Sequence, residues 1–170
     1  MLIVSILSGT PIWVWVLFAY LLLRGLKALR PRDITPLKAF IIPVIFFALA
    51  CIGIFTKLAD WPLAILAFAI ALVVGFVGGW GNAARLPAAT FDRVTGKIWR
   101  PGSATLLVLV ILAFVSKYSL GVALAMHPNL GGQDGFALLY GGISGVFDGA
   151  FWGGTIQQFR CAFTPRAAAI

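Results

Sequence analysis

The sequence predicts an all-α membrane protein, a bundle of five transmembrane helices that forms one integral membrane domain over residues 1–170. Three observations predict this class. The mean hydropathy is +1.02, and only 11% of the residues are charged, whereas roughly a quarter are charged in a soluble domain. Apolar runs of about 20 residues, long enough to span a hydrocarbon core, recur along the chain. Lysine and arginine gather in alternate loops between these runs.

The five apolar runs define the expected helices. Their ranges are about 11–29, 36–56, 61–84, 103–126 and 136–159. The first helix is expected to start at Pro11, because proline suits the first turn of a helix better than its interior. Thr35 is the expected N-cap of the second helix, and Pro43 inside that helix predicts a kink. Asp60 is expected to cap the third helix ahead of Trp61.

The basic residues in the loops predict the orientation of the bundle. The loop after the first helix and the loop after the third are rich in lysine and arginine. The loop after the second helix carries only Lys57, and the loop after the fourth carries none. Because cytoplasmic loops carry the excess of positive charge, the N-terminus is expected outside and the C-terminus in the cytoplasm. A four-helix bundle would break this alternation unless the first run fails to span.

The loop between the third and fourth helices predicts a short hairpin on the cytoplasmic face. Thr95 and Gly96 form a turn signal between Val94 and Ile98, and the flanking residues are aromatic or β-branched.

Small residues recur at every fourth position in two of the helices. The fifth helix carries Gly141, Gly145, Gly149 and Gly153. The third helix carries Ala67, Ala71, Gly75 and Gly79. Residues four apart share a helix face, and small residues let two helix backbones approach closely in lipid. These faces are expected either to build the protein's own bundle or to contact a second subunit, as a homo-oligomer or within a larger membrane complex.

Two opposite charges lie within the apolar runs. Lys117 is about 14 Å from the end of the fourth helix, and Asp148 is about 18 Å from the start of the fifth, at 1.5 Å per residue. An isolated charge at this depth costs about 2.5–3.5 kcal/mol on insertion scales, so we expect the two groups to pair. The pair is either a structural contact that fixes helix register or a proton or ion relay. The candidate polar neighbours are Tyr118, Asn82, Tyr140 and Ser144.

The remaining residue content gives little support to enzyme or metal chemistry. Glutamate is absent and His127 is the single histidine, so no metal or bis-histidine haem set is expected. Cys51 and Cys161 are expected to be apolar fillers without a disulfide. No cofactor, no catalytic residue and no nucleic-acid partner is expected. The basic loop residues are interpreted as contacts to anionic lipid headgroups, namely Arg30, Arg32, Arg93, Lys97 and Arg100.

Five short stretches give the chain a family resemblance. They are Thr10–Trp15, Leu29–Arg32, Asp92–Gly96, Arg100–Ser103 and Lys117–Tyr118. With these stretches the chain resembles a family of small bacterial inner-membrane proteins of unknown function, over nearly its whole length. The loop with a glycine turn between two membrane helices is also loosely similar to the CcdC-like membrane proteins. The resemblance implies a multi-pass protein of the bacterial inner membrane, and it assigns no site residue.

These observations lead to two functional hypotheses. The first is a non-enzymatic multi-pass membrane protein that acts as a scaffold or accessory subunit and packs through its small-residue helix faces. The alternative is a small proton-linked transporter or channel that works through Lys117 and Asp148. A membrane enzyme or a haem or quinone carrier has the least support from the residue content.

Overall fold

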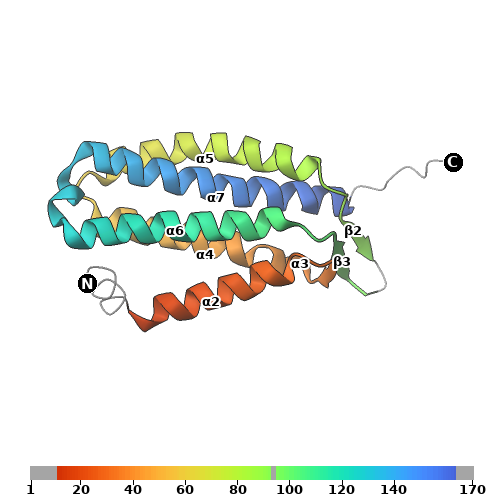
Figure 1. Ribbon diagram of the computed structural model, residues 1–170. Coiled ribbons are helices and arrows are strands. Elements are labelled where there is room, and N and C mark those ends of the chain that lie inside the picture. The colour runs from red at the N-terminus through yellow and green to blue at the C-terminus, as the bar shows by residue number, and fades with distance from the viewer. Residues whose placement is uncertain (1–10, 93–94, 164–170) are drawn as a thin grey trace.

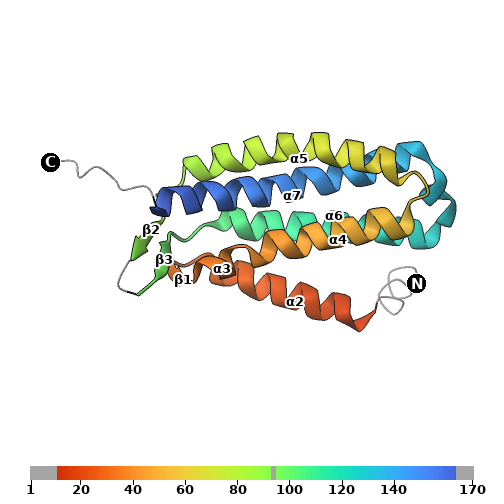
Figure 2. The ribbon, with the colours of Figure 1, turned by 180° about the vertical axis from the view of Figure 1, so that it is seen from behind.

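The computed structural model describes residues 11–92 and 95–163 and is mostly helical (Figure 1). Its long helices lie side by side and alternate in direction, and a view from behind shows the same arrangement (Figure 2). They are α2 (Ile12–Lys27), α4 (Ile41–Lys57), α5 (Trp61–Ala84), α6 (Ala104–Met126) and α7 (Asp134–Phe163). The short helix α3 (Pro36–Ala39) precedes α4, and the 3₁₀ helix η1 (Pro128–Gly132) joins α6 to α7.

Side chains cap two helices where the sequence predicts a boundary. The Asp60 carboxylate accepts a hydrogen bond from the backbone N–H of Leu63 at 3.2 Å, which confirms it as the N-cap of α5. The Ser103 hydroxyl accepts from the backbone N–H of Thr105 at 3.2 Å and caps α6. The observed bounds of α5 and α6 therefore follow the expected ranges closely.

The second predicted helix is divided, and the break lies at Phe40, three residues before the Pro43 at which a kink is expected. The chain starts a helix at Pro36 after the N-cap Thr35, breaks at Phe40, and begins α4 at Ile41. Pro43 therefore lies in the first turn of α4. The first four N–H groups of a helix have no partner within it, so proline removes no hydrogen bond there.

A small sheet covers one end of the bundle (Figure 1). Strands β2 (Thr90–Asp92) and β3 (Lys97–Arg100) form the predicted antiparallel hairpin, and Gly96 in its turn has a φ of +64°. A third strand, β1 (Arg32–Ile34), pairs antiparallel with β3, which gives the order β1-β3-β2. Ile98 of β3 is buried and packs the sheet against the end of α7. The sequence did not reveal β1, because three residues are too short for a periodic pattern.

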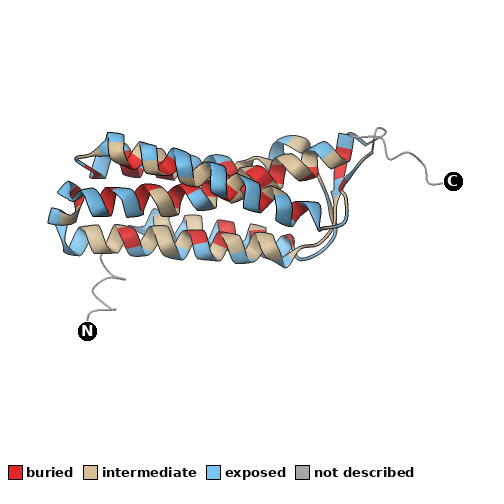
Figure 3. Ribbon diagram, turned by 90° about the horizontal axis from the view of Figure 1, so that it is seen from above, coloured by how far each residue is buried: buried red, intermediate tan, exposed pale blue. Residues whose placement is uncertain are grey.

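The core consists of two clusters between the helices. Buried residues lie where the helices face one another, and exposed residues lie on the outside of the bundle (Figure 3). One cluster joins α4, α5, α6 and α7 in the half near η1 and includes Phe68 and Phe136. The other joins α2, α4, α6 and α7 nearer the sheet, and we call it the apolar plug; its buried members are Leu21, Ile42, Phe46, Val110, Ala113 and Phe151.

Two helices are long and apolar enough to cross a membrane. They are α5 with 24 residues and α6 with 23 residues, judged by length and composition among the described residues. Helix α4 is apolar but shorter.

Candidate functional site

The structure brings Lys117 and Asp148 together inside the bundle. The Nζ atom of Lys117 on α6 lies 3.7 Å from Oδ2 of Asp148 on α7, and the side chains are 10% and 0% exposed. Helix α6 packs against α7 and runs in the opposite direction, so residues at equal depth meet. The sequence predicts that the two charges lie at equal depth on neighbouring helices, and the 3.7 Å contact between them agrees with this prediction.

Two polar side chains of α7 continue the site on the same helix face. Ser144 and Tyr140 lie four and eight residues before Asp148, and all three are buried. The Tyr140 side chain is within electrostatic range of the Asp148 carboxylate. Cys51 of α4 is likewise close enough to the Lys117 amino group for an electrostatic interaction. The sequence suggested only a packing role for this thiol.

Several polar atoms at this site have no hydrogen-bond partner among the described residues. They are Lys117 Nζ, both carboxylate oxygens of Asp148 and the hydroxyl oxygen of Ser144. The Lys117–Asp148 distance fits an ion pair and is too long for a hydrogen bond. A buried pair that serves only to fix structure is expected to have its remaining donors and acceptors satisfied. Lys117 and Asp148 have no such further partners among the described residues.

A cavity of about 590 Å³ opens beside the pair between α2, α4, α6 and α7, and we call it the central cavity. Lys117 and Tyr140 contribute to its wall, and Trp13 and Phe114 make the wall aromatic. The cavity extends to Lys57 and Met126, where α4 and α6 end at the far side of the bundle from the sheet.

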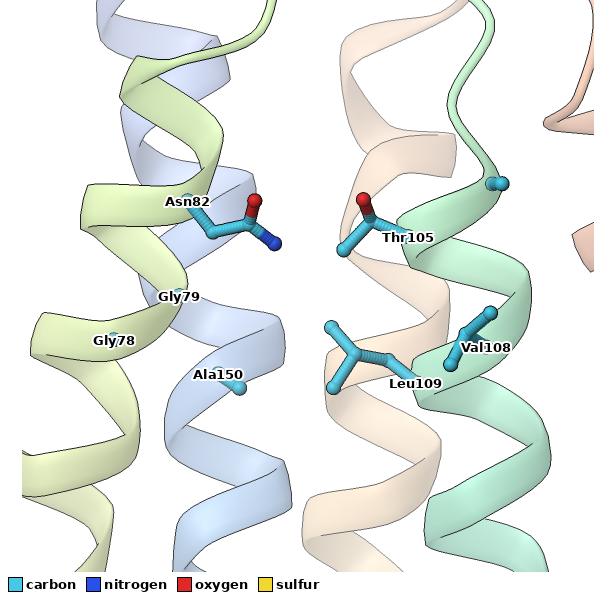
Figure 4. Close-up of a pocket in the computed structure, with 8 residues that line it drawn as sticks. Gly78, Gly79, Asn82, Thr105, Val108, Leu109 and Ala150 are labelled. Atoms are coloured by element: carbon cyan, nitrogen blue, oxygen red, sulfur yellow. The ribbon is translucent and has the colours of Figure 1, made fainter.

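A second cavity of about 460 Å³ lies near the sheet between α5, α6 and α7, and we call it the sheet-side cavity (Figure 4). Asn82 on α5 and Thr105 on α6 point toward one another across it, and Ala150 lies deeper along α7. Asn82, expected as a neighbour of the ion pair, is therefore placed in this other cavity. The reason is its position in the last turn of α5, far along the helix axis from the level of Asp148.

The apolar plug separates the two cavities. Phe46 of the plug lines the central cavity. Leu109, which packs against the plug, lines the sheet-side cavity. The rings of Phe46 and Phe151 stack at 4.9 Å between centroids, and Phe151 lies three residues beyond Asp148 on α7. The ion pair thus sits at the inner end of one cavity, with a dry apolar layer between it and the other.

Tyr118, the remaining expected neighbour, belongs to the contact between α6 and α2. Its ring stacks on Phe114 at 6.1 Å and packs against Trp15 at 6.5 Å. Tyr118 also lines the central cavity, together with Trp13 and Phe114.

The two small-residue faces pack against each other within the chain. A Cβ added at Gly149 would overlap the carbonyl oxygen of Leu72, and one added at Gly75 would overlap that of Val146. The same close approach to α5 backbone occurs at Gly141, Gly145 and Gly153, and Gly79 approaches α7 in the same way. Ala71 lies against Gly145, and Ala67 is half-buried on the same helix. These small residues therefore pack α5 and α7 against each other within the chain.

The basic residues near the sheet fall into two groups. Arg30 and Lys97 are exposed, and Arg93 lies outside the described residues. Arg32 and Arg100 face each other across β1 and β3 and are half-buried. Burial and the nearby Arg32 guanidinium lower the pKa of Arg100 to about 10, and burial and Arg24 lower the pKa of Arg32 below its ordinary value.

Comparison with known proteins places the chain in a family. The model of a family of unknown function, DUF6622, matches residues 1–169. The uncharacterized protein PM0739 of Pasteurella multocida is 32% identical over 111 residues, which are 65% of this chain and 85% of that protein. No solved structure matches the chain. These findings confirm the resemblance seen in the sequence, and the chain belongs to the DUF6622 family of unknown function.

Proposed function

We propose that the chain crosses the bacterial inner membrane five times, with its N-terminus outside and its C-terminus in the cytoplasm. The exposed apolar surface supports this placement. Only 22% and 17% of the most apolar windows of α5 and α6 are buried in the bundle, whereas apolar helices of a soluble protein turn most of this surface inward. In lipid the outward apolar face costs nothing.

The other long helices fit the same placement. At 1.5 Å per residue, α2 and α4 are about 24–26 Å long, close to the hydrocarbon thickness of roughly 30 Å. Both present large apolar side chains outward, including Val16, Val44 and Ile52. Helix α7 has 30 residues and is less apolar on average because its glycines and polar residues face the bundle interior.

Within this membrane protein, the Lys117–Asp148 pair supports a non-enzymatic role as a small proton-linked transporter or channel. One observation carries this function: a buried pair with unsatisfied polar atoms lies at the inner end of the central cavity, and the sheet-side cavity begins beyond the apolar plug. Intramembrane charges mark ion and proton pathways in membrane proteins. In the proposed orientation, the central cavity opens outward and the sheet-side cavity lies in the cytoplasmic half.

The proton would move by way of Asp148. A proton that enters from the central cavity binds the carboxylate and removes its attraction for Lys117. The Lys117 side chain, which already lines the central cavity, can then turn into it. Release of the proton toward the sheet-side cavity requires the Phe46–Phe151 stack to part, after which the ion pair forms again.

Proton flux into proteoliposomes tests this function. We expect Asp148→Asn to lower the flux under a pH gradient at least about ten-fold, because its amide cannot cycle a proton. Asp134→Asn is the matched control, since Asp134 is exposed in the first turn of the same helix. Equal flux from wild type and Asp148→Asn contradicts the proposal. If Asp148→Asn unfolds and the exchange Lys117→Asp with Asp148→Lys restores folding, the pair is structural.

A role as scaffold or accessory subunit, as a homo-oligomer or in a larger complex, is the second candidate. The small-residue faces of α5 and α7 already pack against each other inside the bundle, so a contact with a partner would need another surface of the protein. The outward face of α5 offers one, because Gly81 has open space beside it and Val74 and Val77 are exposed. The mass of the protein purified in mild detergent tests this role. A stable monomer without a co-purifying partner contradicts it.

A further inference from the structure

The two faces of the small sheet carry opposite charges. Side chains of directly opposed strand residues point to the same face, so the register places Arg32 and Arg100 on the face of the buried Ile98. This face packs against the end of the helix bundle. Asp33, opposite Trp99, and Asp92, opposite Lys97, belong to the other face, which points away from the bundle.

Arg32 and Arg100 form a like-charge pair without a carboxylate beside it. Like charges directly opposite each other on two strands destabilise the pairing. Within the described residues, Arg100 donates no hydrogen bond and joins no ion pair, and the charge that acts on it is Arg32. Arg32 donates one long hydrogen bond, at 3.4 Å, to the carbonyl oxygen of Arg24. Most of the N–H groups of the two guanidinium groups thus have no partner among the described residues.

The geometry points to a phosphate site: we propose that Arg32 and Arg100 together bind the phosphate group of an anionic phospholipid. Paired guanidinium groups present planar sets of N–H donors that match phosphate oxygens, and a phosphate would turn their repulsion into attraction. Arg24 adds positive charge beside Arg32 without donating to the site, because its own guanidinium bonds the Tyr20 hydroxyl and the Lys38 carbonyl.

The surroundings of the site favour a lipid over free phosphate. Arg100 comes four residues before α6, a helix apolar enough to cross a membrane, and the arginine face of the sheet is turned toward the helices. Leu29 and Leu37 are exposed apolar residues near the sheet in sequence, and Trp99 is exposed on the opposite face of the sheet; tryptophan prefers the depth of the headgroups. The lipid source rests on the membrane placement proposed above, whereas the phosphate chemistry rests on the arginine pair alone.

Thermal unfolding of the full chain in detergent tests this site. We expect added phosphatidylglycerol to raise the unfolding midpoint of the wild-type protein, and added phosphatidylcholine, whose headgroup has no net charge, to have little effect. Arg32→Gln and Arg100→Gln should each weaken the apparent affinity for phosphatidylglycerol about ten-fold or more, since each removes charge-assisted hydrogen bonds. Arg30→Gln is the matched control, because it removes the same charge from a neighbouring exposed position.

Two further readouts separate this site from a structural role of the arginines. Without lipid, Arg100→Gln should fold and be at least as stable as wild type, because it relieves like-charge repulsion. Equal effects of the two lipids, equal losses in Arg30→Gln and Arg100→Gln, or stabilisation by millimolar inorganic phosphate as strong as that by phosphatidylglycerol would overturn the proposal. A protein that stays soluble without detergent would instead contradict the membrane placement, and a lipid effect without proton flux would contradict only the transport function.

Discussion

The hydroxyl group of Tyr140 on α7 lies against the α-carbon of Gly53 on α4, in the space where any other residue would carry its Cβ atom. Both residues line the central cavity, and Tyr140 is within electrostatic range of Asp148. The absence of a side chain at position 53 therefore lets a tyrosine reach across the bundle beside the ion pair. This contact ties the wall of the cavity to the charged site.

Gly53→Ala should displace the Tyr140 ring and destabilise the bundle by about 1–3 kcal/mol, the usual cost of overpacking. Tyr140→Phe in the same chain removes the obstructing oxygen and should recover part of the loss, because the ring carbon Cζ still lies 2.6 Å from the added Cβ. Thermal unfolding of the two single variants and the double variant measures this coupling. Gly121→Ala, at a cavity position with open space around it, is the control and should cost little. Additive effects of Gly53→Ala and Tyr140→Phe would show that the contact does not exist.

Gly149→Ala should destabilise the contact between α7 and α5 by about 1–3 kcal/mol or more, because the backbone of Leu72 occupies the space for the new methyl group and backbone cannot move aside cheaply. Gly142→Ala on the same helix has no atom within 4 Å of the added Cβ. It should be neutral or stabilising by up to about 1 kcal/mol, since alanine favours helix more than glycine. Comparable unfolding midpoints for the two variants would contradict the observed packing.

Lys117→Met should cost about 3–5 kcal/mol, because it leaves the Asp148 carboxylate buried without a counter-charge. Adding Asp148→Asn removes the orphaned charge and should restore most of the stability while proton flux stays lost. Equilibrium unfolding together with flux measurements follows both properties. If the double variant is no more stable than Lys117→Met, the two groups do not interact as an ion pair.

Asp60→Ala should lower stability by about 0.5–2 kcal/mol, the usual effect of losing a side-chain N-cap. Asp60→Asn keeps an oxygen that can accept from the Leu63 N–H and should stay close to wild type. Thermal unfolding compares the two. An equal loss in both variants would mean that the negative charge, and not the cap, supplies the stability.

Much of the helical arrangement could be predicted from the sequence, because apolar runs, caps and prolines are local signals. The start of α5 at Trp61 follows from Asp60 and Pro62, and the hairpin turn follows from Gly96. The pairing of Lys117 with Asp148 was predictable from their equal depth and opposite charge. The break at Phe40 was missed because a proline inside an apolar run is ambiguous between a kink and a first turn.

The rest of the site depends on contacts between distant segments, which a single sequence does not reveal. Nothing near Gly53 indicates that Tyr140 packs against it, and the small-residue pattern could not distinguish a partner within the chain from a second copy. Asn82 was grouped with the ion pair on polarity alone, although its place at the end of α5 puts it at another level. The three residues of strand β1 are extended because they pair with β3, a strand distant in the sequence, and not because of a local sequence signal.

Labelling from the two sides of the membrane tests most directly whether the bundle spans the bilayer with the ion pair reached from outside. Gly121→Cys and Asn82→Cys place a thiol in the central and in the sheet-side cavity, in a chain whose Cys51 and Cys161 are replaced by alanine. A membrane-impermeant thiol reagent should modify position 121 only from outside and position 82 only from the cytoplasmic side. Modification of both positions from the same side, or of position 121 only from the cytoplasm, would contradict the proposed topology and the route to Lys117 and Asp148.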